Sequence, residues 1–198
     1  MDLKIKDYAP NYEKQWLECL KETFYASSYY DMILKVKPRY EQPIVEHIIL
    51  HGGKIVAFLD IELIPPSEQL CSKDEEYCGQ ISLIGVHPKY RRQKIATKLL
   101  EKAITIIRKD NQINRLEVSF REDNEITPWF HSMNFIPCEK YYEVSFSQDF
   151  FIKYGIELPY GLNPSLLTGF VDQKGFRILS TDHPPEKTFP YLIMEKKI

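Results

Sequence analysis

Short apolar runs with alternating polarity or β-branched residues recur along the chain and predict β-strands. The clearest pair, residues 45–50 and 54–64, is separated by the triplet His-Gly-Gly. A two-glycine turn between such runs is typical of a β-hairpin. Further strands are expected at residues 3–9, 80–86, 114–120, 138–146 and 191–198.

Apolar residues at helical spacing predict helices over residues 11–27 and 98–109. A second short helix is expected over residues 27–40, ended by Pro38. Thr127 is a candidate N-cap for another short helix, residues 127–133, and Asn134 after it can adopt the left-handed conformation that ends a helix. Residues 65–79 are polar and irregular, which indicates a loop.

The order of these elements predicts an α/β (α+β) fold, with a mixed, mostly antiparallel central sheet flanked by helices. The first strands are joined by tight turns, and only the later strands are joined by a helix. No repeat or low-complexity linker interrupts the chain, so we expect one domain over residues 1–198. Residues 147–190 match no clean period and form an apparent insertion before the last strand.

Composition narrows the class of protein. The 43% of hydrophobic residues suffices for a globular core, and no run approaches the roughly 20 apolar residues of a membrane helix. The net charge of -2 does not favour nucleic acid as a partner. The four cysteines lack zinc-ligand or CxxC spacing, so free thiols in a reducing cytoplasm are expected.

The stretch VHPKYRRQKIATKLL, residues 86–100, joins an expected strand to an expected helix. The first turn of a helix carries backbone amides without intrahelical partners and the positive end of the helix dipole, so such a junction suits an anion. Arg91, Arg92 and Lys94 add cations, and a phosphate or pyrophosphate would fit. The alternative is that these charges form only a solvated helix start.

This stretch resembles motif A of the GNAT superfamily of acyl-CoA-dependent N-acyltransferases, in which a strand ends V-x-P-x-Y-R and Q/R-x-x-G-x-G/A opens a helix. GGKIVAFLDIEL is similar to the hairpin of that family, TPWFHSMNF resembles its W-Y-E-x-M-G-F helix, and YLIMEKKI resembles its closing strand. The resemblance covers about residues 1–145 and the last strand.

The resemblance implies acetyl-CoA as cofactor, with coenzyme A as product. It implies that the pyrophosphate meets backbone amides from Arg91 to Ala96 and that the pantetheine arm follows the strand through Ile84 and Val86. The residues implied to bind the cofactor are Ile84, Val86, Arg91, Arg92, Gln93, Lys94, Ile95, Ala96, Thr97, Asn124 and Phe130. Gly85 fits either a bulge that admits the ligand or a packing position opposite a bulky residue.

Three departures from the family pattern bear on chemistry. Lys94 replaces the central glycine of the motif, and Phe130 replaces a tyrosine that often protonates the leaving thiolate. Gln80 or Ser82 stands where a strand carboxylate often acts as base, and either could only hold a water.

Catalytic candidates are therefore Asp60, Glu62 and Ser82. Asp60 and Glu62 share one strand face if the alternation holds, and they could bind or deprotonate a cationic amine. The alternative is that both carboxylates lie on the solvated face of the sheet.

The function expected from the resemblance is transfer of an acetyl group from acetyl-CoA to a primary amine, of a small molecule or a peptide, by direct attack. A catalytically silent acyl-CoA-binding or regulatory protein is the alternative. The aromatic segments 24–31 and 150–170 are expected on the acceptor side, or at the interface of a homodimer. No metal, nucleic acid or membrane is expected to take part.

Overall fold

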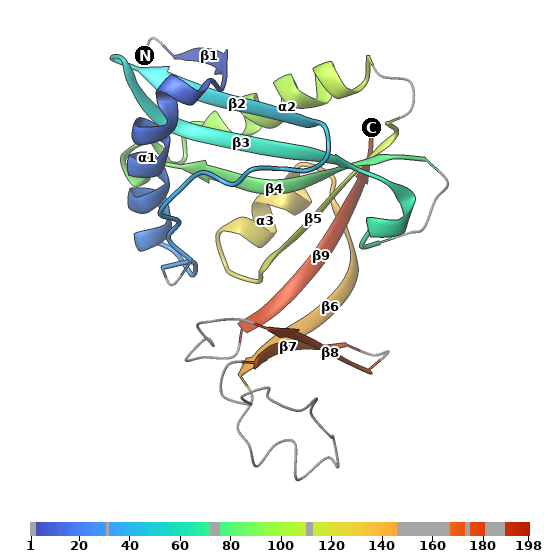
Figure 1. The fold of residues 1–198 in the computed structure, drawn as a ribbon. Coiled ribbons are helices and arrows are strands. Elements are labelled where there is room, and N and C mark those ends of the chain that lie inside the picture. Colours follow the sequence, from blue (N-terminus) through green and yellow to red (C-terminus); the bar gives the residue numbers. More distant parts are fainter. Residues whose placement is uncertain are drawn as a thin grey trace.

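The computed structural model describes residues 3–30, 32–71, 76–109, 113–145, 167–172, 175–180 and 189–198. In these residues the strands form one sheet in the order β1-β2-β3-β4-β5-β9-β6-β7-β8 (Figure 1). The strands are β1 (Lys4–Asp7), β2 (Ile44–His51), β3 (Lys54–Ile64), β4 (Cys78–Val86), β5 (Arg115–Arg121), β6 (Ile136–Ser145), β7 (Leu167–Asp172), β8 (Gly175–Ser180) and β9 (Phe189–Lys197). The helices are α1 (Glu13–Tyr25), α2 (Ile95–Ile107) and α3 (Ile126–Ser132), with 3-10 turns at Pro10–Tyr12, Pro66–Glu68 and Pro88–Tyr90.

The sheet is mixed and mostly antiparallel, as predicted. All neighbouring strands in the described residues pair antiparallel except β4 and β5, which are parallel. The β2–β3 hairpin closes through Gly52 and Gly53, with φ values of 57° and 78°. Both angles lie in the left-handed region that glycine adopts without steric cost, which explains the pair at this turn.

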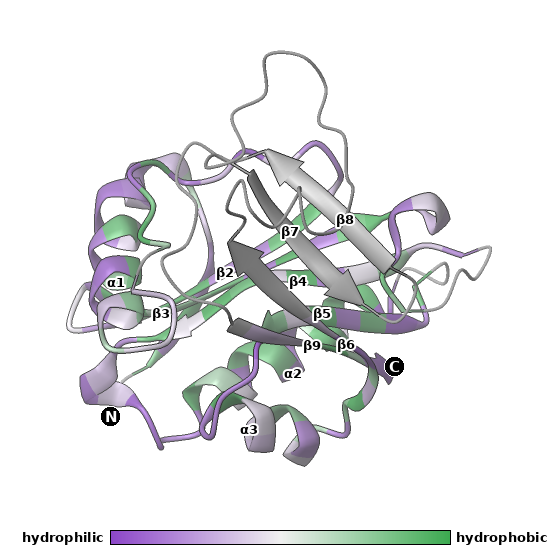
Figure 2. Ribbon diagram, turned by 90° about the horizontal axis from the view of Figure 1, so that it is seen from below, coloured by the Kyte–Doolittle hydropathy of each residue, from purple (hydrophilic) through white to green (hydrophobic). Residues whose placement is uncertain are grey.

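Helices cover both faces of the sheet, each over its own hydrophobic core. Helix α1 packs on β3 and β4 through a cluster that includes Trp16, Leu20 and Phe58. Helix α2 lies on the opposite face, where Leu99 and Leu100 join a larger cluster. Figure 1 shows α1 in front of the strands and α2 behind them, and Figure 2 shows α2 and α3 together on one side of β4 and β5. In the described part of the chain no helix has the length and apolarity to cross a membrane.

The helix predicted over residues 27–40 is wrong. The described residues of this stretch form turns, bends and irregular backbone, which cross the α1 face of the sheet (Figure 1). The Tyr29 hydroxyl accepts a hydrogen bond from the Arg121 amide on β5 at 2.7 Å, and the Lys37 ammonium donates to Asp60 on β3. The contacts of Tyr29 and Lys37 are with different strands, β5 and β3, and a single helix over residues 27–40 is not formed between them.

Part of the region without a clean sequence period is ordered as strands β7 and β8, which extend the sheet beyond β6. The other residues of 147–188 lie outside the described ranges. The assignment of residues 1–198 to one domain with an insertion near 147–190 stays a prediction.

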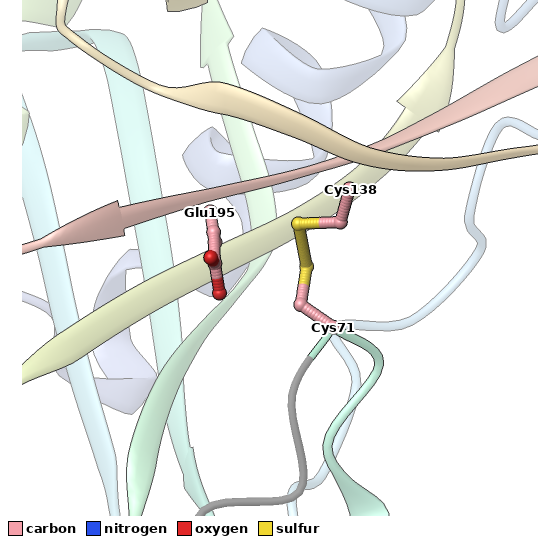
Figure 3. A group of neighbouring side chains, drawn as sticks. All are labelled: Cys71, Cys138 and Glu195. Carbon is pink, nitrogen blue, oxygen red and sulfur yellow. A yellow bond between two sulfur atoms is a disulfide. The ribbon is translucent and has the colours of Figure 1, made fainter.

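The prediction that all cysteines are free thiols is wrong for two of them. Cys71 and Cys138 form a disulfide with their Cα atoms 5.7 Å apart, and Glu195 lies beside the sulfur atoms (Figure 3). Cys19 and Cys78 remain thiols, as predicted, and both are buried. The bonded cysteines are 67 residues apart in sequence. The sheet order that brings β6 beside β9 places Cys138 near the loop after β3, and no spacing rule could reveal that.

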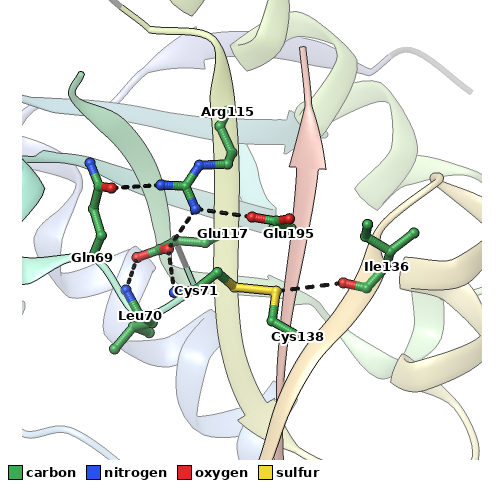
Figure 4. The surroundings of a disulfide bond; sticks show 8 residues. All are labelled: Gln69, Leu70, Cys71, Arg115, Glu117, Ile136, Cys138 and Glu195. Atoms are coloured by element: carbon green, nitrogen blue, oxygen red, sulfur yellow. Dashed lines mark hydrogen bonds and ion pairs between the residues drawn. A yellow bond between two sulfur atoms is a disulfide. The ribbon is translucent and has the colours of Figure 1, made fainter. Parts of the chain in front are cut away.

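A network of buried polar groups surrounds the disulfide and holds the loop after β3 (Figure 4). The Glu117 carboxylate accepts hydrogen bonds from the amides of Leu70, at 2.9 Å, and Cys71, at 3.2 Å. The Arg115 guanidinium lies 3.5 Å from Glu117 and donates to Gln69 at 2.6 Å. The two charges at the start of β5 are thus paired and hydrogen-bonded, which is what permits their burial.

Candidate active site

The two parallel strands separate at the centre of the sheet. β4 and β5 pair only at Gly79–Leu116, Gln80–Glu117 and Ile81–Val118, although β4 continues to Val86 and β5 to Arg121. Figure 1 shows the two strands diverging from this point, with α3 behind the opening. Among the described residues, the facing backbone edges beyond Ile81 and Val118 have no strand partner across the opening, so they can serve a ligand.

A β-bulge lies where the strands part. The register between β3 and β4 shifts from Asp60–Leu83 to Ile61–Ile81, which leaves Ser82 as the extra residue. Ser82 is half-buried, and its hydroxyl donates to the Gln80 carbonyl at 3.4 Å. Bulges locally re-aim side chains and are common beside active sites. A bulge is one of the two sequence interpretations of Gly85, and the structure places the bulge three residues earlier.

Gly85 instead has a packing role, the second of the two sequence interpretations. It pairs with Phe58 across β3 and β4. A Cβ built on Gly85 would lie 2.4 Å from Cζ of the Phe58 ring. The glycine is therefore required by the ring that covers it.

The loop between β4 and α2 presents unpaired backbone amides. Arg92 and Lys94 have φ values of 62° and 58°, so the chain passes twice through the left-handed region before α2 begins at Ile95. Within the described residues, the amides of residues 92–97 have no hydrogen-bond acceptor. The N-cap residue, Lys94, makes no side-chain cap. This is the arrangement that the sequence predicted for an anion, and a phosphate group fits its donors.

Only some of the loop's cations are available to such an anion. The side chains of Arg92, Gln93 and Lys94 are exposed. The guanidinium of Arg91 donates to the carbonyls of Thr23, at 3.1 Å, and Ala26, at 3.3 Å. Arg91 therefore ties the loop to the C-terminal end of α1, and its side chain has a structural partner.

Helix α3 packs beside the N-terminal turn of α2. Trp129 is half-buried, and its indole nitrogen donates to Thr97 Oγ1 at 3.2 Å. Thr127 is not the N-cap, because α3 begins at Ile126. The N-cap is Glu125, which makes no side-chain cap, and the Asp123 carboxylate accepts from the amides of Glu125, at 2.8 Å, and Ile126, at 2.6 Å. Asn134 adopts a φ of 63°, as predicted.

Two residues implied to bind cofactor differ sharply in exposure. Asn124 is exposed beside α3. Phe130 has no exposed surface and packs against Phe120, Trp129 and Phe135, with ring centroids 4.8 to 5.1 Å apart. In this arrangement the Phe130 ring is part of the core and offers no surface to a ligand.

Asp60 does not lie on a solvated face of the sheet. Its carboxylate is fully buried on the α1 face and accepts from Lys37 Nζ at 2.6 Å and from the Tyr40 hydroxyl at 2.9 Å. Burial raises the pKa of Asp60, and the adjacent Lys37 ammonium opposes that shift. Glu46 contacts the same ammonium at 2.6 Å. The ammonium also lies over the ring of Trp16, 4.7 Å from its centroid.

Glu62 is half-buried on the same strand, and its carboxylate accepts from the amide of Gln42 at 3.3 Å. Both carboxylates of β3 thus hold the segment that precedes β2. Of the three catalytic candidates from the sequence, Ser82 lies at the strand opening itself. Ile84 and Val86 are half-buried on the part of β4 beyond its last pair with β5, in contact with the α2-side core. The Val86 carbonyl accepts from Arg91 Nε at 3.3 Å.

Sequence reasoning missed the polar residues that β5 and β6 place beside the opening. Ser119 follows the last paired residue of β5, and the hydroxyl of Tyr141 on β6 lies 2.6 Å from Ser119 Oγ. Arg121 donates to the Tyr191 hydroxyl at 3.1 Å. The only sequence signal was the alternation of polar residues in RLEVSFR, which marks one face of a strand but not which face meets the opening.

The fold and this junction define an α/β protein whose central sheet opens beside a loop with unpaired backbone amides. The sequence profile of the acetyltransferase (GNAT) family matches residues 5–135, which is more than half of the chain. The protein therefore belongs to the GNAT family. A search of curated protein sequences found no match.

Solved structures of acetyltransferases share the fold. The ribosomal-protein-S18-alanine N-acetyltransferase from Escherichia coli is 14% identical, with a TM-score of 0.61, covering 100% of this chain and 94% of that chain. The PaiA N-acetyltransferase from Thermoplasma acidophilum, in complex with coenzyme A, is 14% identical, with a TM-score of 0.54 and full coverage of both chains. NAA60 from Arabidopsis thaliana, in complex with a bisubstrate analogue, is 13% identical, with a TM-score of 0.61, covering 100% and 98%.

Proposed function

We propose that the protein transfers an acetyl group from acetyl-CoA to a primary amine. One observation carries the proposal: the opening between β4 and β5 lies next to the unpaired amides of residues 92–97, within the part of the chain that matches the GNAT family. An open strand edge and a set of amides suit the two chemically different parts of an acyl-CoA, its amide-containing arm and its pyrophosphate.

The residues of the loop fit a pyrophosphate by charge and by hydrogen bonding. The amides of residues 92–97 would donate to its oxygens, and the exposed Arg92 and Lys94 side chains would add positive potential. The backbone edge of β4 at Ile84 and Val86 would hold the arm. Coenzyme A is bound in the Thermoplasma structure, and acetyl-CoA in another structure of NAA60, which supports this class of cofactor.

The reaction is direct attack of the amine nitrogen on the thioester carbonyl, followed by departure of the thiol. Holding both reactants in one orientation supplies much of the rate enhancement for such a transfer. Ser82, at the bulge, can orient a water or donate a hydrogen bond to the acyl oxygen. Asp60 is buried and bound by Lys37 and Tyr40, so we assign it a structural role rather than that of a base.

The acceptor is a primary amine of a small molecule or a peptide. Aromatic residues of the segment before β2 lie on the α1 face of the sheet, where Tyr29 contacts the Arg121 amide. The solved structures include enzymes named for acetylation of an alanine amine of a ribosomal protein and a complex with a bisubstrate analogue. A cytoplasmic location and a homodimer remain predictions.

A catalytically silent acyl-CoA-binding protein is the second candidate. It is favoured by the burial of Phe130, which has no proton to give, and by the engagement of Asp60 with Lys37. It predicts cofactor binding without turnover.

Calorimetric titration with acetyl-CoA, coenzyme A and ADP tests the cofactor site. We expect stoichiometric binding of acetyl-CoA and coenzyme A, and weaker binding of ADP because it lacks the arm that the β4 edge would hold. Equal affinity for ADP and acetyl-CoA would show a general nucleotide site and overturn the assignment. A panel of primary amines, assayed for thiol release from acetyl-CoA, then separates the enzyme from the silent binder.

A further inference from the structure

The charged side chains on the α1 face near the strand opening are already committed to structural partners. Asp60 binds Lys37, Glu62 accepts the Gln42 amide, and Glu117 accepts two amides of the loop after β3. Phe130 has no ionisable group. We therefore examine the hydroxyl groups at the opening as groups that could move a proton.

Ser119 and Tyr141 form a hydroxyl pair at this place. Their oxygens lie 2.6 Å apart, and either can be the donor. Both residues are half-buried, so neither is sealed in the core. A short contact between two hydroxyls that can exchange donor and acceptor roles permits a proton to pass in either direction.

Strand register places this pair at the opening and on the α1 face. Ser119 is the first residue of β5 after Val118, the last to pair with β4. Val118 and Phe120 belong to the core on the α2 face, so Ser119 projects to the opposite face. Tyr141 stands on β6, beyond β9, and its ring therefore reaches across β9 to meet Ser119.

The ring of Tyr141 is held in this orientation. It stacks on Tyr191 with centroids 5.0 Å apart. The Tyr191 hydroxyl in turn accepts from the buried Arg121 guanidinium, which also lies over the Tyr191 ring. Stacking on Tyr191, which Arg121 holds in place, fixes the Tyr141 phenol. The phenol therefore loses little conformational entropy when it takes part in a proton transfer.

We propose that Ser119 and Tyr141 are a catalytic proton relay for acetyl transfer, an inference that rests on the proposed function. As the amine nitrogen bonds to the carbonyl carbon, the bond between that carbon and sulfur breaks. The nitrogen gives a proton to Ser119 Oγ, the Ser119 proton passes to the Tyr141 oxygen, and the Tyr141 proton passes to the departing sulfur. Both hydroxyls are restored, and the products are an N-acetyl amine and free thiol.

Steady-state kinetics of Tyr141→Phe and Ser119→Ala test the relay with an amine that the wild-type protein acetylates. Tyr141→Phe keeps the ring and its stacking on Tyr191 but removes the relay oxygen. We expect kcat to fall about 100-fold, in the range of general acid–base catalysis, while acetyl-CoA affinity by calorimetry and the thermal midpoint stay within error of wild type. Tyr77→Phe, on an exposed tyrosine of the loop after β3, is the matched control and should keep wild-type kcat.

The double variant distinguishes a relay from two independent contacts. Residues that act as one unit are not additive, so the double variant should lose about as much kcat as the worse single variant. The relay would be overturned if the kcat losses of the two single variants multiplied in the double variant. It would also be overturned if kcat were unchanged, or if only the KM of the amine changed. Absence of turnover in the wild-type protein with every amine would instead contradict the proposed function itself.

Discussion

Gly85 and the ring of Phe58 show how one residue can be required by its neighbour across a strand. A Cβ at position 85 would overlap the ring, so Gly85→Ala forces β4 or the ring to move. We expect a loss of about 1–3 kcal/mol in the free energy of unfolding, measured in denaturant. In a Phe58→Leu background, Gly85→Ala should lower the free energy of unfolding by less than it does in the wild-type protein. An equal loss in both backgrounds would refute the clash.

Lys94 occupies a backbone conformation that suits glycine. Its φ of 58° is sterically unfavourable for lysine because of the Cβ atom, whereas glycine adopts this angle without strain. This difference agrees with the glycine that the family pattern has at this position. Lys94→Gly should raise the free energy of unfolding by about 1 kcal/mol. Lys98→Gly, at an exposed position inside α2, should lower it by about the same amount, and a loss in both variants would contradict the account.

At the scale of elements, the segment before β2 depends on a buried ammonium. Lys37→Met leaves the Asp60 carboxylate buried without its cation, and such a change typically costs about 3–5 kcal/mol. Thermal or chemical unfolding measures it, with Lys35→Met, on an exposed lysine of the same segment, as the control. The double variant Lys37→Met, Asp60→Leu should recover much of the loss. No recovery would show that the pair's charge is not the cause.

The sequence could predict the elements whose signals are local. The two glycines at the turn predict the β2–β3 hairpin, and the spacing of apolar residues predicts which face of α2 is buried. The stretch 27–40 has helical spacing too, yet contacts of Tyr29 and Lys37 with different strands override it. Local patterns do not reveal which strands lie side by side. The burial of Phe130, the Lys37–Asp60 pair and the disulfide all depend on that arrangement.

For the whole molecule, His47 links stability to pH. It is buried on β2, with Nδ1 3.0 Å from Asp7, and burial lowers its pKa despite the opposing effect of that carboxylate. The unfolded chain then binds the proton more readily, so this contribution to stability is present above the unfolded pKa of about 6.5 and is lost as the pH falls below it. Thermal unfolding between pH 8 and pH 5 should show this decline, and His47→Gln should flatten it. An identical pH profile in the variant would contradict the role of His47.

The central claim is that the opening between β4 and β5 supports acetyl transfer. The most direct measurement is the release of free thiol from acetyl-CoA by the purified protein in the presence of a panel of primary amines, with the acetylated amine identified by mass spectrometry. We expect thiol release that requires both protein and amine and that equals the amount of N-acetyl product formed. Stoichiometric binding of acetyl-CoA without product from any amine would contradict it and leave the silent binder as the function of this fold.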